Sequence, residues 1–130
     1  MSKFKKEHLE EISGGIKLYN QGKFWECHEE LEDHWMEAAH DNVRFIYWAI
    51  IQAATALYHM EDENLKGAEG MWKKAKDKLN KCEEHAVESP LLYQSLSWDE
   101  FKKLIRSIPD KPILKDFNEL HNFKFKKEKK

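Results

Sequence analysis

Residues 24–35 read FWECHEELEDHW, a stretch in which polar side chains fall on the apolar side of a helical repeat. At about 100° per residue, His28 lies inside the apolar stripe and Glu32 lies beside it, whereas Glu29 lies on a flank. A histidine and a carboxylate among apolar neighbours must find partners or lose their charge. The spacing therefore predicts a polar site on the buried side of this helix.

The apolar run at residues 45–58 supplies a partner for that site. It contains one amide, Gln52, which must be hydrogen-bonded if it is buried. If the two helices fold back as an antiparallel hairpin about a turn near His40, residues whose numbers sum to about 80 lie level. This register pairs Gln52 with His28, so we expect an imidazole, a carboxylate and an amide to converge.

Aromatic side chains are expected to edge the same site. The helical repeat places three of them near the polar cluster, Trp25, Trp35 and Tyr58. His59 follows Gln52 by seven residues on the same face, about 10 Å further along the helix axis. We therefore predict that His59 lies at the rim of the site, where it could act on a bound ligand.

Apolar residues recur at i, i+3 and i+4 in block after block, and this pattern predicts an all-α protein. We expect a compact, partly open bundle of about five helices with the hairpin at its centre. Gly22 should end the first helix, and Asp41 and Asn64 should cap the third and fourth. Beyond the bundle we expect a helical extension over residues 90–121 and a lysine-rich, frayed tail over residues 122–130.

The 130 residues suit a single helical domain that spans residues 1–130. The 22 basic and 24 acidic residues are nearly balanced, which gives no electrostatic case for nucleic-acid binding. The longest apolar run, residues 45–58, falls short of the roughly 20 residues that cross a bilayer. With two cysteines and a charged N-terminal segment, the sequence favours a cytoplasmic protein with no membrane partner.

Residues 28–32 approach the helical H-E-x-x-H zinc motif, with Glu32 in place of the second histidine and Glu29 as a base. The i, i+4 spacing permits His28 and Glu32 to bind one divalent metal. However, a catalytic zinc needs three protein ligands, and His59 is displaced by about two turns. A metal site is therefore less favoured than no cofactor.

Two other readings remain open. In the first, His28 and Glu32 form an acid/base pair while Gln52 orients a small ligand or substrate in an open pocket. In the second, the three residues form a satisfied polar network that fixes the register of the helices and does nothing more. The third helix is apolar nearly all round, so a homodimer through that helix accompanies the second reading.

Residues 22–35 and 50–59 together resemble a bacterial and archaeal family described as domain of unknown function 309. The family pattern G-x-(Y/F)-(F/W)-E-x-H-E-x-x-E-x-x-W matches the first segment, and (L/I)-I-Q-x-A-x-A-x-x-H matches the second. Asn64 and residues 67–68 match its next element, and the resemblance extends over about residues 22–79. It implies an all-helical bundle with a charged and aromatic site at His28, Glu29, Glu32, Trp35, Gln52 and His59.

The resemblance implies no known activity. The favoured interpretation is an uncharacterised small soluble helical protein that binds a small ligand between its second and third helices. A metal-dependent or acid/base hydrolase that uses the H-E-x-x-E segment, and a homodimeric interaction module, are the alternatives.

Overall fold

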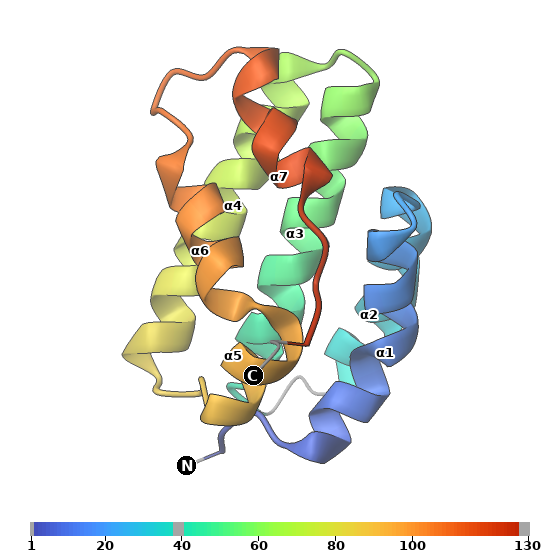
Figure 1. Ribbon diagram of the computed structural model, residues 1–130, viewed down its shortest axis with the longest axis vertical. Helices are drawn as coiled ribbons and strands as arrows, with labels where there is room; N and C mark the ends of the chain where they lie inside the picture. The colour runs from blue at the N-terminus through green and yellow to red at the C-terminus, as the bar shows by residue number, and fades with distance from the viewer. Residues whose placement is uncertain (1, 38–40, 128–130) are drawn as a thin grey trace.

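The computed structural model describes residues 2–37 and 41–127, and all the regular structure in these residues is helical (Figure 1). It contains α1 (Lys6–Asn20), α2 (Phe24–Glu37), α3 (Arg44–Glu61), α4 (Leu65–Glu84), α5 (Pro90–Leu96), α6 (Trp98–Ser107), the 3-10 helix η1 (Leu114–Phe117) and α7 (Asn118–Asn122). The all-α prediction is confirmed, but about five helices was too few. The short α5 and α7 span seven and five residues, too few for a periodic pattern to reveal them.

Helix α3 lies at the centre of the fold, with α4 on one side and α1 and α2 on the other (Figure 1). It packs most extensively against α4 and α2. Most of its residues are buried, including the two polar residues Gln52 and Thr55. An apolar surface on nearly all sides of one helix is what such a central position requires. The helix that suggested a dimer interface is thus covered within one chain over most of its surface, with Tyr47 fully buried.

The helix ends follow local chemistry that the sequence largely reveals. Gly22 has a φ of +77° and ends α1 as predicted, because only glycine adopts this left-handed conformation without strain. Asn64 caps α4 by accepting a hydrogen bond from the N–H of Gly67 at 3.0 Å. Asp41 accepts from the N–H of Val43 at 3.0 Å, but α3 begins only at Arg44. Asp41 therefore stabilises the turn before α3 and does not cap the helix.

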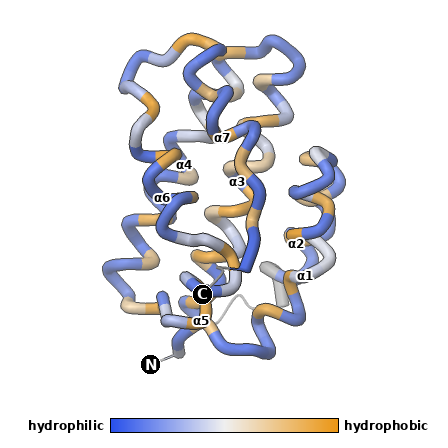
Figure 2. Tube along the Cα trace, in the orientation of Figure 1, coloured by the Kyte–Doolittle hydropathy of each residue, from blue (hydrophilic) through white to orange (hydrophobic). Residues whose placement is uncertain are grey.

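The segment after α7 is the clearest departure from expectation. A frayed end was predicted from residue 122, yet Phe123 and Phe125 are buried. Both rings pack against Phe101 of α6, with centroids 5.8 and 4.9 Å away, and Phe125 also contacts Tyr19 of α1. The segment passes in front of α3, and apolar and polar residues alternate along it (Figures 1 and 2). The prediction is wrong for residues 123–127, because the lysines there are only the outward half of this alternation, and its last part, residues 128–130, lies outside the described residues.

No helix in the described ranges combines the length and the apolar character that a bilayer crossing requires.

Candidate functional site

A pocket of about 250 Å³ lies where α2, α3 and α4 meet. Its lining residues come from all three helices, namely His28, Glu32, Trp48, Ile51, Gln52, Thr55 and Met71. The structure thus brings together His28, Glu32 and Gln52, the three polar residues that the helical spacing predicts to converge.

Glu32 holds the imidazole of His28 in place. Oε2 of Glu32 lies 2.9 Å from Nε2 of His28, one helical turn away on α2. The His28 side chain is 20% exposed and the Glu32 side chain 53%, so the carboxylate sits at the mouth of the pocket. The ring of Trp25 packs on the imidazole with a centroid distance of 4.8 Å. These contacts fix the orientation of the imidazole and the nitrogen that faces the carboxylate.

Two buried polar atoms of the site lack a partner in the part of the chain that the structure describes. Gln52 is 4% exposed, and its Oε1 accepts no hydrogen bond from the described residues. Nδ1 of His28 is likewise buried and unpaired. Native proteins pair the great majority of buried polar side-chain atoms, so each exception needs an explanation. Five such atoms occur among the described residues, and the two at His28 and Gln52 belong to residues that line one pocket, whereas the hydroxyls of Tyr19 and Tyr47 and Nδ1 of His34 do not.

Thr55 completes the polar side of the pocket. Its hydroxyl donates to the carbonyl oxygen of Ile51 at 2.9 Å, one turn earlier in α3. The hydrogen of the hydroxyl is therefore used within the helix, and only the oxygen lone pairs remain for the pocket.

Other residues predicted for the site lie outside the pocket. The rings of Trp25, Tyr58 and His59 continue from His28 as a row, with centroids 5.1 Å apart between the first two and 5.8 Å between the last two. Trp25 and Tyr58 are 42% and 39% exposed. Glu29 is exposed on α2 and is not a lining residue. Trp35 belongs to α2, but its side chain lies outside the described part.

The sequence interpretation missed four lining residues, Trp48, Ile51, Thr55 and Met71. The first three surround Gln52 at helical spacing, so the wheel that placed Gln52 could have found them. Met71 was harder to find because it requires the register between α3 and α4. The Asn64 cap defines that turn, and folding the chain back about it places Met71 level with Thr55.

The geometry gives the metal interpretation no third ligand. Among the residues that the structure describes, no three histidine, cysteine, aspartate or glutamate side chains are close enough to hold a metal ion. The third ligand considered from the sequence, His59, lies with its Nδ1 3.4 Å from the side-chain amide of Asn64. His28 and Glu32 therefore form a pair, and no described residue adds the third ligand that a metal site would need.

Cys27 precedes His28 in the sequence but is not part of the polar site. Its side chain is fully buried, and burial raises the pKa of its thiol to about 12. A thiol in this state is not a nucleophile near neutral pH. Cys27 is therefore a small core residue.

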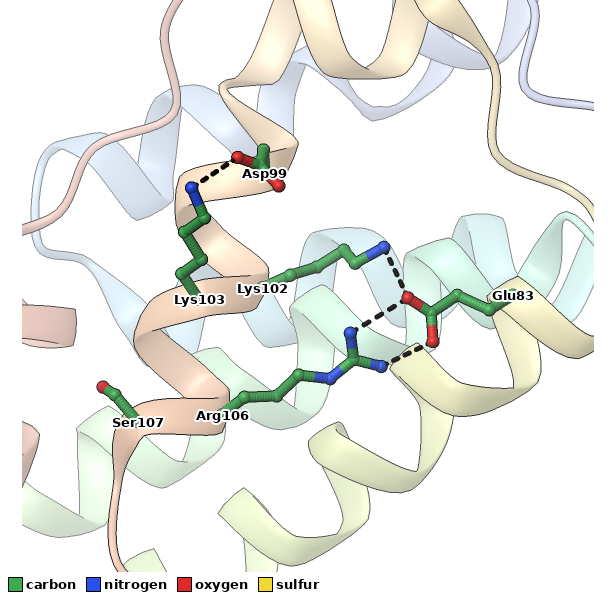
Figure 3. Close-up of a pocket in the computed structure, with 6 residues that line it drawn as sticks. All are labelled: Glu83, Asp99, Lys102, Lys103, Arg106 and Ser107. Carbon is green, nitrogen blue, oxygen red and sulfur yellow. Dashed lines mark hydrogen bonds and ion pairs between the residues drawn. The ribbon is translucent and has the colours of Figure 1, made fainter.

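A second pocket of about 460 Å³ lies along α4 and α6, and Figure 3 shows its lining residues, Glu83, Asp99, Lys102, Lys103, Arg106 and Ser107. Its charged groups pair with one another. Arg106 donates to both oxygens of Glu83, at 2.9 and 2.6 Å, and Lys103 lies 3.0 Å from Asp99. These groups need no ligand to be satisfied, which distinguishes this pocket from the one at His28.

Lys102 connects the second pocket to a buried network. Its ammonium donates to Glu83 at 2.7 Å, to Glu88 at 3.0 Å and to the hydroxyl of Tyr93 at 2.9 Å. Burial alone would lower the pKa of Lys102, but these hydrogen bonds raise it above its usual range. The indole N–H of Trp98 also donates to Glu88, at 2.7 Å. The network joins α4, α5 and α6, and the ammonium of Lys102 and the carboxylate of Glu88 at its centre both have partners.

Residues 12–71 match the model of the family described as Domain of unknown function (DUF309). This match confirms the resemblance and covers α2, α3 and the first part of α4, hence every residue that lines the His28 pocket. It begins before residue 22 and ends before residue 79, the limits expected from the motifs. No curated protein and no solved structure matches the chain.

Proposed function

We propose that this protein binds a small polar molecule in the pocket between α2, α3 and α4. The observation that carries the proposal is the buried Oε1 of Gln52, which no described residue satisfies. A buried acceptor without a partner costs about 1–3 kcal/mol, and turning the amide toward the pocket to accept a hydrogen bond from a ligand would remove that cost.

The surroundings of Gln52 support the same proposal. Nδ1 of His28 is a second unpaired polar atom in a residue that lines the pocket, and Ile51 and Met71 supply apolar walls. Ligand sites typically combine apolar walls with a few converging polar groups. A volume of about 250 Å³ corresponds to about eight water-sized groups at roughly 30 Å³ each, so the pocket has room for a small molecule.

A fragment screen by NMR tests the proposal. Isotope-labelled protein would be titrated with small amines, acids, alcohols and amides while the side-chain signals of His28 and Gln52 are followed. We expect at least one class to shift both signals together, and the shift of the His28 signal to disappear in Gln52→Leu. If no class shifts them, or if hits persist unchanged in Gln52→Leu, the pocket is not a ligand site.

An acid/base hydrolase is the second candidate, and the 2.9 Å contact between Glu32 and His28 favours it. A carboxylate that holds one imidazole nitrogen leaves the other free to accept a proton from water. Thr55 is a poor nucleophile here because its hydroxyl donates to Ile51, so water would attack the substrate. The candidate predicts ester hydrolysis above background that is lost in His28→Ala. No difference between the two proteins on an activated acetate ester would count against it.

A further inference from the structure

The two helices on either side of α3 carry opposite charges on the outer surface around the pocket mouth. We call this surface the pocket face, and its residues are Trp25, Glu29 and Glu32 of α2, Trp48 and Tyr58 of α3, and Gly70, Met71, Lys74, Lys78 and Lys81 of α4. Helix α2 contains no lysine or arginine, and both glutamates are exposed on it. In α4 the three lysines follow the lining residue Met71 at alternating spacings of three and four residues, so they lie on the same side of that helix. The face is therefore acidic on one side and basic on the other.

The acidic and basic sides of the pocket face do not pair within one chain. Among the described residues, its two ion pairs each join neighbours on one helix, Glu32 to His28 and Lys78 to Asp77. The described residues offer no ion-pair partner to the other charged side chains of the face, Glu29, Lys74 and Lys81. Helix α3 lies between α2 and α4 and keeps the two sides apart (Figure 1).

Aromatic side chains are exposed on the same face. Trp25 and Tyr58 are two of the three large apolar side chains that the described part of the chain exposes, and their rings contact each other. Protein interfaces are enriched in aromatic residues, and their rims are polar. An exposed aromatic pair with charged residues around it has this composition.

Residues of α2 and α4 lie level with one another across α3. Both helices run antiparallel to α3, so they run parallel to each other (Figure 1). Lys78 contacts the ring of Trp48, and Glu32 lines the pocket together with Trp48, so Lys78 and Glu32 are level. One turn earlier in each helix, Lys74 is level with Glu29.

Gly70 leaves room for an aromatic ring on the basic side of the face. It lies two turns before Lys78, as Trp25 lies two turns before Glu32, so Gly70 and Trp25 are also level. Gly70 is exposed, and a Cβ at this position would meet no atom within 4 Å. The surface of α4 is therefore open at the level of the exposed tryptophan.

We infer that the pocket face binds a second copy of this chain, in a dimer whose two-fold axis runs parallel to α3. Such an axis keeps every residue at its level and places α2 of each protomer against α4 of its partner. The carboxylates of α2 then meet the lysines of α4, and Trp25 covers Gly70, twice over by symmetry. An axis across the helices would instead place α2 on α2, where like charges oppose binding. The dimer uses the two flanks of α3 and not its buried apolar surface, and it requires no ligand in the pocket.

A charge swap between level residues tests the inference on the full chain. At about 100 µM protein, where a dimer with a Kd of about 10 µM or lower is mostly formed, light scattering should give twice the 15.6 kDa mass of one chain. Glu29→Lys and Lys74→Glu should each weaken the dimer at least about tenfold, because each opposes like charges at two symmetric places. An equimolar mixture of the two variants should form dimers again, since opposite charges then meet at both places.

Glu100→Lys and Lys111→Glu are the matched controls, because they reverse the same charges at exposed residues outside the pocket face. Each should change the Kd of the dimer less than about twofold, since distant exposed charges are screened by salt. Equal losses in the controls and in the variants of the pocket face would mean that only the net charge governs association, and would overturn the inference.

Truncation of the exposed tryptophan tests the apolar part of the interface. Trp25→Ala should weaken the dimer at least about tenfold, as expected for an aromatic residue at the centre of an interface. Ile113→Ala, which truncates an exposed apolar residue elsewhere, should leave it unchanged. A single-chain mass for the unaltered protein at about 100 µM would overturn the inference. A mixture of Glu29→Lys and Lys74→Glu that stays monomeric would overturn it as well, because the level pairing would then be absent.

Discussion

The side-chain amide of Asn20 pairs with the backbone of Phe125, accepting from its N–H at 2.8 Å and donating to its carbonyl oxygen at 2.7 Å. These two residues are 105 positions apart in sequence. The pair fixes the C-terminal segment against the end of α1, and the hydroxyl of Ser97 adds a hydrogen bond to the carbonyl oxygen of Lys126 at 2.9 Å. The segment therefore joins the first helix to α6.

Asn20→Ala should lower the free energy of unfolding by about 1–3 kcal/mol, because it removes two hydrogen bonds in a partly buried place. Chemical denaturation measures the loss. Amide hydrogen exchange at Phe125 should also become faster. The control is Gln21→Ala, which truncates the neighbouring exposed amide and should change stability by less than about 0.5 kcal/mol. Equal effects of the two variants would show that the pair contributes nothing.

The adjacent glycines of α1 should respond in opposite ways to alanine. A Cβ at Gly15 would collide with the side chain of Leu31 in α2, whereas a Cβ at Gly14 would lie at an ordinary 3.4 Å from Glu30. We expect Gly15→Ala to destabilise the protein by about 1–3 kcal/mol through overpacking. Gly14→Ala should stabilise it by up to about 1 kcal/mol through helix propensity. Thermal unfolding of both variants checks the sign of each change in stability. A Gly15→Ala variant as stable as the original protein would contradict the close packing of α1 on α2.

Lys102→Met should cost about 3–5 kcal/mol, because it leaves the carboxylate of Glu88 without its buried cation. The side chains of Lys102 and Glu88 are 9% and 14% exposed, so solvent replaces little of the lost interaction. Adding Glu88→Gln to Lys102→Met should recover part of the stability in urea denaturation. A loss below about 1 kcal/mol in the single variant would mean that the network is not a stabilising element.

Glu83 should give the protein a specific sensitivity to acid. The hydrogen bond from Arg106 is the main cause that lowers the pKa of Glu83 to about 2 from 4.5, with burial opposing and Lys102 assisting. The unfolded chain then binds more protons between these two values, so stability is present above pH 4.5 and is lost as the pH falls toward 2. Glu83→Gln should lack this part of the loss. Plots of the free energy of unfolding against pH should therefore converge at low pH for the two proteins. Parallel plots would contradict the prediction.

The sequence predicted the parts of the fold and site that depend on one helix or one turn. The helical wheel placed His28 and Glu32 together, and a single hairpin register added Gln52. Contacts between distant segments were beyond this reasoning. Nothing local to Lys124 and Lys126 reveals that the phenylalanines between them pack on α1 and α6, and nothing local to Lys102 reveals Glu88 as its partner.

The aromatic residues illustrate the same limit within the site. Trp25 and Tyr58 were expected to edge the pocket, yet they form an exposed row with His59 beside it. A helical wheel gives the direction in which a side chain leaves the helix axis. The packing of the neighbouring helix decides where a pocket remains beside that side chain. Trp48 and Met71 line the pocket instead, because α4 packs on that side of α3.

The free energy of unfolding of Gln52→Leu, measured without added ligand, tests most directly whether the polar cluster serves a ligand or the fold. If Oε1 of Gln52 is kept unpaired for a ligand, replacing it with an apolar side chain leaves stability unchanged or raises it by about 1 kcal/mol. Gln52→Met, which keeps the unbranched shape, should behave in the same way. A loss of about 2 kcal/mol or more in both variants would contradict the account, because it would show that the amide is part of a satisfied network that holds α2 and α3 together.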